Sequence, residues 1–192
     1  MQRENGIVIG LVCDLDDPEK IGRVRVKFPN LDDQVSQWAR IASPMAGGQR
    51  GFFMRPEVDD EVLVAFEQGD PRRPYIVGSL WSKADPPPAD DGKPVDNNWR
   101  FFSSRSGHLM KFDDTDGAER IEIVGQGGQH KLVIDVSGQK IEISCASGDI
   151  AVSAPAGKLS LDAQQIAIHA TTTLELKADG AMTVRGQTVA IN

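Results

Sequence analysis

Short apolar pairs recur at an even spacing through the last third of the chain, from about residue 121 to residue 192. In each pair two apolar residues flank one other residue, so both side chains lie on the same face of an extended strand. Successive pairs start eleven, nine, nine, nine, seven, eight, eight and seven residues apart. A short, regular period is typical of stacked β architectures. The pairs are Ile121 and Ile123, Leu132 and Ile134, Ile141 and Ile143, Ile150 and Val152, Leu159 and Leu161, Ile166 and Ile168, Leu174 and Leu176, Met182 and Val184, and Val189 and Ile191.

The residues around these pairs predict a narrow core shared by several chains. No Phe, Trp or Tyr follows Phe112, and Pro155 is the only later proline. One strand per repeat cannot bury two apolar side chains alone, and the period is too short for the wide coils of a single-chain β-helix. We therefore predict an intertwined prism of three chains, which also leaves no lateral sheet edge. The eighteen paired residues form its trimer core, and polar positions face outward: Glu122, Lys131, Lys140, Glu142, Lys158, Glu175, Lys177 and Arg185.

The first 81 residues predict a different kind of β unit. Strand-like runs are separated by turn residues such as Asp16, Asp17 and Pro18, and none has helical periodicity. Five or six strands in this length predict a small OB-type barrel. The predicted fold class is therefore all-β, an OB-fold barrel followed by a trimeric, triple-stranded β-helix prism. The predicted strands cover residues 6–13, 22–28, 37–42, 51–53, 61–66 and 75–80.

Two short segments connect the barrel (residues 1–81) to the spike (residues 121–192). Residues 82–98 are rich in proline and aspartate, which is typical of a stiff, extended linker. This linker is too short to hold a folded enzyme domain. Residues 99–120 predict collar strands that lead into the prism, with an acidic turn at Asp113, Asp114 and Asp116.

Charge and cysteine content exclude several classes of function. The net charge of −7 argues against broad nucleic-acid binding. Residues 1–81 contain ten basic and thirteen acidic residues. Cys13 and Cys145 match neither a disulfide framework nor a metal motif and are expected to be buried thiols.

No signal peptide or membrane helix is indicated, so synthesis in the cytoplasm is expected. The basic clusters Arg23, Arg25 and Lys27, and Arg72 and Arg73, are expected to be solvated or to meet an acidic partner.

No residue pattern indicates a metal, a cofactor or a catalytic centre. Asp113, Asp114 and Asp116 do not have the spacing of a calcium-binding EF-hand loop. His108 is expected to be a polar residue in a strand, without a second metal ligand nearby. His130 lies in a glycine-rich loop and also has no second ligand. His169 is expected to point away from the prism axis, because it follows Ile168.

Motifs of the first 81 residues resemble the barrel of contractile-tail spikes, the family of phage baseplate assembly protein V, central tail spikes and VgrG proteins. The resemblance implies a homotrimer that meets a hub protein at its barrel end and a PAAR-type tip protein at Val189, Ile191 and Asn192. An iron-binding His-x-His pair found in some spikes of this family is absent. The motifs are Gly22-Arg-Val-x-Val-x-Phe-Pro29, Trp38-Ala-Arg40, Gly51-Phe-x-x-x-Pro56-Glu-Val-x-Asp-Glu-Val62, Gly69-Asp-Pro71 and Pro74-x-x-x-Gly78, and the tract from Ser104 to Asp114 resembles the start of the prism.

The expected function is thus mechanical: a non-enzymatic, cell-puncturing central spike in the baseplate of a tail or injection system, in transient contact with the target-cell membrane. Because the barrel begins at about residue 6, a separate hub protein is expected. An excised C-terminal part of a type VI secretion VgrG is the first alternative. A β-helix carbohydrate-active enzyme and an OB-fold nucleic-acid binder are others, disfavoured by the short period and by the charge.

Overall fold

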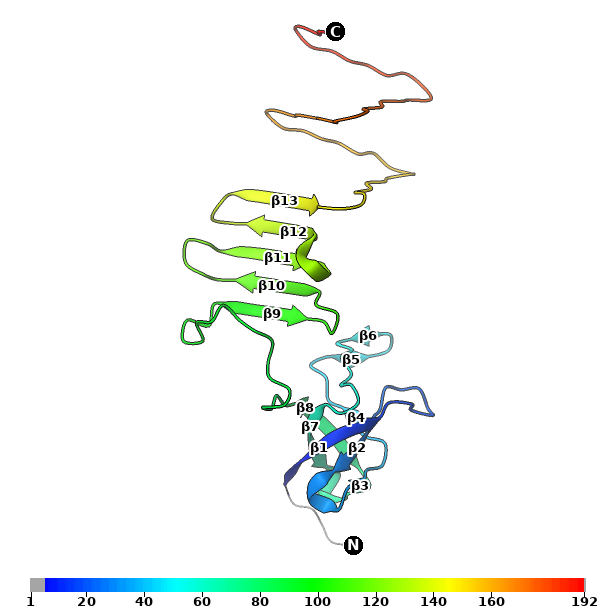
Figure 1. Cartoon of the computed structure of the whole chain (residues 1–192). Coiled ribbons are helices and arrows are strands. Elements are labelled where there is room, and N and C mark those ends of the chain that lie inside the picture. Colours follow the sequence, from blue (N-terminus) through cyan, green and yellow to red (C-terminus); the bar gives the residue numbers. More distant parts are fainter. Residues whose placement is uncertain (1–5, 192) are drawn as a thin grey trace.

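The computed structural model describes residues 6–191, and the only regular elements in this part are β-strands and three short 3-10 helices. Figure 1 shows three regions in succession: a compact N-terminal unit, a separate flat sheet and a winding C-terminal segment. No helix in residues 6–191 has the length and apolar character needed to cross a membrane.

The N-terminal unit is built on a six-stranded sheet with the order β3-β2-β1-β7-β8-β4. Its neighbouring strands are antiparallel, except that β4 and β8 are parallel. Register shifts interrupt the β1–β2 and β7–β8 ladders, and such irregularities increase strand twist. The strands are β1 (Ile7–Asp14), β2 (Arg25–Phe28), β3 (Gln34–Val35), β4 (Arg40–Ile41), β7 (Glu61–Phe66) and β8 (Pro74–Ser79).

A bridge between Val24 and Ala39 closes this curled sheet into an OB-like barrel. Each residue donates its backbone N–H to the other's carbonyl, at 3.0 and 2.8 Å. The bridge joins the residue before β2 to the residue before β4, near opposite ends of the strand order. The rings of Phe28 and Phe66 lie 5.9 Å apart in the barrel interior. The buried core comprises Val12, Val24, Val26, Phe28, Ala39, Val62, Val64, Phe66 and Ile76.

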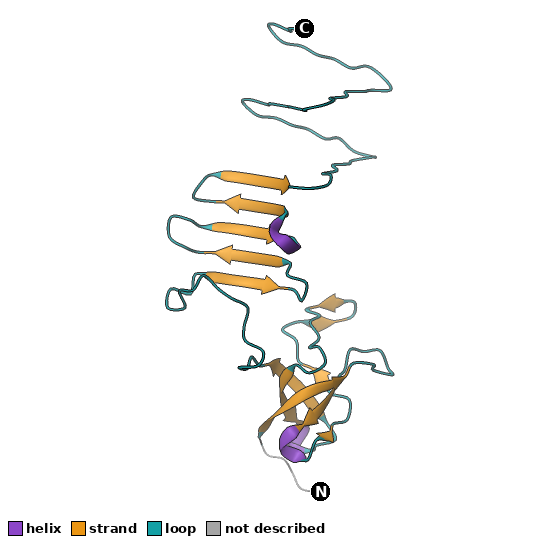
Figure 2. Cartoon of the chain, viewed as in Figure 1, coloured by secondary structure: helices purple, strands orange, loops and turns teal. Residues whose placement is uncertain are grey.

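Residues 42–55 form an arm that leaves the barrel between β4 and β7. Its centre is a hairpin of β5 (Ala46–Gly47) and β6 (Arg50–Gly51). Gly51 has a φ of +142°, and a Cβ there would lie 2.4 Å from the Met45 carbonyl oxygen, so the arm requires glycine at this position. Figure 2 shows the hairpin between the barrel and the second sheet. The helices η1 (Pro29–Leu31) and η2 (Glu67–Gly69) complete the N-terminal unit.

The second sheet is an antiparallel meander of five strands that lie across the long axis of the molecule (Figure 2). One ion pair within residues 6–191 joins it to the barrel, from the Arg105 guanidinium to the Glu57 carboxylate at 2.5 Å. The strands are β9 (Trp99–Ser103), β10 (Leu109–Asp113), β11 (Arg120–Val124), β12 (His130–Asp135) and β13 (Lys140–Cys145), and η3 (Gln126–Gly128) joins β11 to β12.

Beyond β13 the described chain contains no strand. Residues 146–191 run back and forth as an extended segment (Figure 1) and are exposed throughout. The one backbone hydrogen bond within residues 146–191 runs from the Gly157 N–H to the Ala154 carbonyl, at 3.1 Å. The first three apolar pairs therefore lie on strands β11, β12 and β13, whereas the six later pairs have no strand partner within the single chain.

Three predicted barrel strands, 6–13, 61–66 and 75–80, match β1, β7 and β8 within one residue at each end. The run 37–42 is reduced to the two residues of β4. The run 22–28 is shortened to β2, because Val24 pairs with Ala39 instead of β1. The run 51–53 contributes only Gly51 to a strand, because the chain turns back at the β5–β6 hairpin. The short strand β3 was not predicted; its two residues, Gln34 and Val35, have no apolar alternation.

Candidate functional site

Six of the predicted core residues share one face of the second sheet. Ile121 is opposite Ile134, which is opposite Ile141; Ile123 is opposite Leu132, which is opposite Ile143. Phe112, Met110 and Phe102 extend the same face toward β9. We call these nine residues the apolar face: Phe102, Met110, Phe112, Ile121, Ile123, Leu132, Ile134, Ile141 and Ile143.

Nothing within residues 6–191 covers the apolar face. Six of its nine side chains are exposed, including Ile141 at 72%, and Ile121, Leu132 and Ile134 are half-buried between their neighbours. Polar residues border this face. Arg100 lies opposite Phe112 and pairs with Asp114 at 3.1 Å, and His130 lies two residues before Leu132 on the same side of β12. A contiguous apolar sheet face of this kind marks an interaction surface.

The later apolar pairs repeat this exposure along residues 150–191. All twelve side chains are exposed in the single chain. His169 is exposed as well. These residues are Ile150, Val152, Leu159, Leu161, Ile166, Ile168, Leu174, Leu176, Met182, Val184, Val189 and Ile191.

The opposite face of the second sheet carries a network of charges centred on Lys111. Its ammonium lies 2.8 Å from Glu122, 3.3 Å from Asp113 and 3.9 Å from the centre of the Trp99 ring. Arg120 contacts both carboxylates, at 3.6 Å from Asp113 and 3.4 Å from Glu122. Lys111 and Asp113 are buried, so each needs the other's charge to offset the loss of water.

Hydrogen bonds hold Asp113 in its charged form. Burial by itself raises the pKa of the Asp113 carboxyl, but hydrogen bonds from Thr115 and Lys111 outweigh burial and place that pKa below its ordinary value. Asp113 thus belongs to a structural ion-pair network, not to an exposed acidic turn. The signal in the sequence was the alternation of Lys111 and Asp113 with apolar residues on one strand and of Glu122 with isoleucines on the next.

The basic positions of the barrel are occupied by contacts within the chain. Arg23 pairs with the buried Asp17 at 2.7 Å, and Lys27 lies 3.8 Å from Asp33. The Arg25 guanidinium stacks 5.8 Å from the Trp38 ring centre and donates a hydrogen bond to the Ser36 carbonyl. Arg72 and Arg73 pair with Asp70 and Glu67. The expected basic strand face is therefore largely neutralised from inside the molecule.

Asp17 organises the loop between β1 and β2. Its carboxylate accepts hydrogen bonds from the backbone N–H groups of Glu19, Ile21 and Arg23 and from the Arg23 guanidinium. The Arg23 hydrogen bond is the main cause that lowers the pKa of Asp17 far below its ordinary range. The Asp-Asp-Pro sequence predicted a turn here, but it did not show that the second aspartate is buried.

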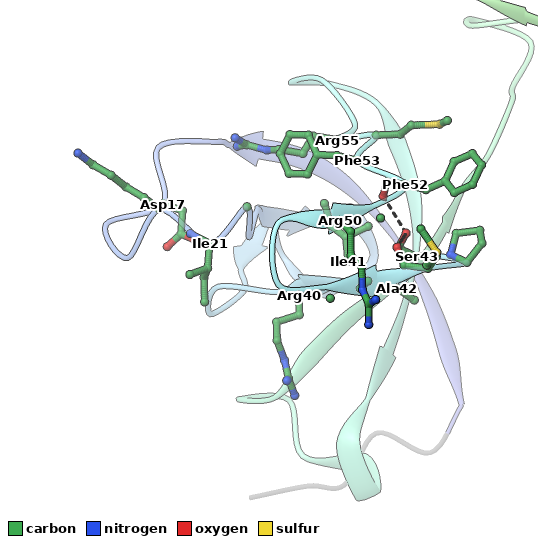
Figure 3. Close-up of a pocket in the computed structure, with 18 of the residues that line it drawn as sticks. Asp17, Ile21, Arg40, Ile41, Ala42, Ser43, Arg50, Phe52, Phe53 and Arg55 are labelled. Carbon is green, nitrogen blue, oxygen red and sulfur yellow. Dashed lines mark hydrogen bonds between the residues drawn. The ribbon is translucent and has the colours of Figure 1, made fainter.

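A hollow of about 1260 Å³ lies between the arm and the loop that Asp17 organises (Figure 3). Exposed apolar side chains surround it, among them Phe53, which is 78% exposed and covers Gly22. The other apolar contributors are Ile21, Met45, Phe52 and Met54. The charged residues of the lining are Lys20, Arg40, Arg50, Arg55, Asp16 and Asp17. The sequence did not predict this hollow, because its walls come from two separate segments, within residues 15–22 and 40–55.

Residues 8–81 match the family described as the type VI secretion system/phage-baseplate injector OB domain. A type VI secretion system spike protein, VgrG4b of Pseudomonas aeruginosa, is 34% identical over 119 residues, covering 56% of this chain and 14% of that protein. The chain is therefore similar to VgrG spike proteins, that is, VgrG-like. A second spike protein of P. aeruginosa, VgrG1a, is 28% identical over 126 residues, which cover 60% of this chain and 20% of VgrG1a.

Other relatives of the VgrG-like chain share shorter stretches. The actin cross-linking toxin VgrG1 of Vibrio cholerae is 39% identical over 72 residues, or 35% of this chain and 7% of the toxin. The chain spans a fifth or less of the length of each of these relatives.

The histidines and cysteines of the VgrG-like chain lie apart from one another. No group of three His, Cys, Asp or Glu residues within residues 6–191 is placed to hold a metal ion. His108 precedes β10 instead of lying in a strand, and its Nδ1 accepts a hydrogen bond from the Gln126 N–H. His130 Nε2 lies 3.0 Å from the Ser147 carbonyl oxygen.

Both thiols are half-buried, not buried as expected. Cys145 ends β13, where no further strand covers it, and its thiol donates to the Ser147 carbonyl. Burial raises the pKa of the Cys13 thiol, so this group is held as a neutral thiol.

The predicted tip contact is exposed where the structure describes it. Val189 is exposed, and Ile191 is 91% exposed. Asn192 lies outside the described residues.

Proposed function

We propose that the VgrG-like chain forms a homotrimer in which three copies meet on one axis through the apolar face and the later apolar pairs. The observation that supports this most is the state of residues 150–191. Their twelve paired apolar side chains are exposed, and their backbone has almost no hydrogen-bond partner within residues 6–191. A segment of this kind is completed by strands from other copies.

The energetics favour assembly over a single extended chain. Fully burying a Val, Leu or Ile side chain contributes about 1.5–3 kcal/mol. A buried backbone needs partners for its N–H and C=O groups. Strands β11 to β13 already pair within one chain, and strands from neighbouring copies provide the partners along residues 150–191. The resulting triple-stranded β-helix has the eighteen predicted residues in its core.

In this trimer the parts of the chain have separate roles. Residues 1–81 are the barrel that attaches to a hub protein, residues 82–98 are a linker, residues 99–120 are the collar and residues 121–192 are the spike. The trimer acts as a non-enzymatic central spike that pierces the target membrane. A PAAR-type tip protein covers the distal apolar residues Val189 and Ile191.

Mass measurement in solution tests the trimer. Light scattering coupled to size exclusion should give three times the 20.8 kDa of one chain, and the species should resist SDS. A monomer at micromolar concentration would show that the apolar face has no such role.

The hub and tip contacts need separate experiments. The trimer should bind a PAAR-type protein encoded beside it. Removing residues 189–192, the last predicted level, should abolish this binding while the remaining levels keep the chain trimeric. Retained binding by that variant would exclude these residues as the tip contact.

A second candidate is the same spike as the C-terminal part of a longer type VI secretion protein. The matched relatives favour it, because the chain corresponds to a fifth or less of their length. Mass spectrometry of the protein purified from its native cells distinguishes the two.

A further inference from the structure

The hollow beside the arm is lined by both exposed apolar and basic side chains. Phe52, Phe53, Met45, Met54 and Ile21 give it an exposed apolar rim. Four cations line it, and none of the four makes an ion pair with any residue in the range 6–191: Lys20, Arg40, Arg50 and Arg55. Asp16 and Asp17 also line the hollow, but Asp17 is paired with Arg23. Arg40 donates a hydrogen bond to Tyr75. The Tyr75 hydroxyl is the main group that lowers the pKa of Glu67, and Arg40 lies close enough to lower that pKa as well. The lining therefore keeps an excess of positive charge, which comes from Lys20, Arg50 and Arg55.

The linker has the complementary composition. Residues 86–88 are three consecutive prolines, and Asp85, Asp90, Asp91 and Asp96 flank them. Within residues 6–191 none of these carboxylates is in an ion pair. Proline-rich segments are pre-organised as polyproline II helices, which dock in grooves lined by aromatic side chains at low entropic cost. Carboxylates beside the prolines add attraction to basic groups.

We propose that the acidic, proline-rich linker of one copy docks in the hollow of a neighbouring copy. This inference rests on the homotrimer proposed above. The prolines lie against Phe52 and Phe53, and Asp90 and Asp91 approach Arg50 and its basic neighbours. Three such contacts around the axis tie each barrel to the next one.

The linker's own chain does not fill the hollow. No linker residue is among those that line it. The hydrogen bonds made by residues 83–96 stay within the linker, for example from the Gly92 N–H to Asp90 and from the Lys93 N–H to Asp91. Figure 1 shows the linker reaching β9 on the side of the molecule away from the β5–β6 hairpin. We therefore take the linker of a neighbouring copy as the occupant of the hollow.

Disulfide trapping in the full-length protein tests this contact. Met54→Cys lies in the hollow and Ala89→Cys follows the prolines, in a background carrying Cys13→Ala and Cys145→Ser. Mild oxidation should produce covalent dimers and trimers on non-reducing gels, and reduction should remove them. Gln34→Cys with Ala89→Cys is the matched control, because Gln34 is an exposed residue on β3 and does not line the hollow.

The outcomes separate this inference from the trimer itself. A trimeric mass with no cross-link, or with a cross-link only inside one chain, would overturn the docking and leave the trimer standing. A monomeric mass would overturn both. Cross-linking of the Gln34 control at the same rate would show non-specific collisions and would also overturn the docking.

Charge reversal gives an independent measurement. Arg50→Glu should slow the cross-linking roughly two- to five-fold, as expected for an exposed ion pair. Adding Asp90→Lys to that variant should restore the rate. Equal rates in all three proteins would contradict the charge complementarity on which the docking depends.

Discussion

The barrel and the C-terminal region use the same apolar residues in opposite ways. In the barrel, Val12, Val62 and Val64 are completely buried, whereas in the C-terminal region Val152 and Val184 are exposed. The barrel sheet curls until Val24 meets Ala39, so one chain supplies both walls of its core. The second sheet stays flat, and its apolar face has no second wall among residues 6–191. Burial thus depends on whether a strand order can close within one chain.

The largest expected effect comes from placing a charge in the proposed trimer core. Ile168→Asp would bring three carboxylates to the axis without partners, at a cost of several kcal/mol per chain. We expect the trimeric, SDS-resistant species to disappear while the barrel stays folded. His169→Asp is the matched control, because the neighbouring side chain is expected to face outward. Equal losses in both variants, measured by light scattering, would contradict the assignment of faces.

A cavity in the barrel should leave assembly intact. Ile76 is 1% exposed in the core, so Ile76→Ala should lower the free energy of barrel unfolding by about 2–5 kcal/mol. The neighbouring Val77 is 47% exposed, and Val77→Ala should change it by about 0.5 kcal/mol or less. Urea unfolding followed by tryptophan fluorescence measures both. The mass in solution should not change, and loss of the trimer in Ile76→Ala would show that the two regions are coupled.

The stability of the barrel should depend on pH through Asp17, in the loop between β1 and β2. The pKa of Asp17 is lowered in the folded state, so the unfolded chain binds more protons as the pH falls below its unfolded value of about 3.9. The stability contributed by Asp17 is therefore present above that pH and is lost progressively below it. Asp17→Asn should lower the melting temperature at pH 7 and reduce its dependence on pH below about 4.

Some acid dependence should remain in that variant. The pKa of Asp70 is lowered to about 2, mainly by hydrogen bonds from Arg72, and the pKa of Asp113 is lowered as well. An unchanged pH profile in Asp17→Asn would contradict the role of Asp17. Asp16→Asn provides the control, since Asp16 is exposed and no ion pair within residues 6–191 involves it.

The smallest effect is expected at the junction. Arg105 and Glu57 form the ion pair between the barrel and the second sheet, and both side chains are largely exposed. Exposed pairs contribute about 0–1 kcal/mol, so Arg105→Ala should change the melting temperature of either region little. A shift of both transitions together, seen by calorimetry, would mean that the regions unfold as one unit.

The repeating patterns of the sequence predicted much of this fold. The pairs Ile121 and Ile123, Leu132 and Ile134, and Ile141 and Ile143 correctly predicted strands that present two apolar side chains on one face. Strand β7 coincides with the predicted run 61–66. These features depend on local alternation, which can be read from neighbouring residues.

Features that depend on distant partners could not be predicted in this way. The extension of the apolar face to Phe102, Met110 and Phe112 follows from cross-strand register. The burial of Lys111 depends on Glu122 and Trp99 arriving from two other strands. The hollow depends on the arm folding back over the loop around Asp17. Pairing of residues 150–191 stays a prediction, because strands from other copies would have to complete it.

The crosswise strands of the second sheet have a directional consequence for mechanical load. Because the strands lie across the long axis (Figure 2), their ladder hydrogen bonds run along that axis. Compression along the axis pushes adjacent strands together from a spacing of about 4.8 Å, where steric repulsion resists shortening. Tension along the same axis opens the ladders one strand pair at a time. The meander is therefore stiff under compression along this axis, and its strands separate more easily under tension.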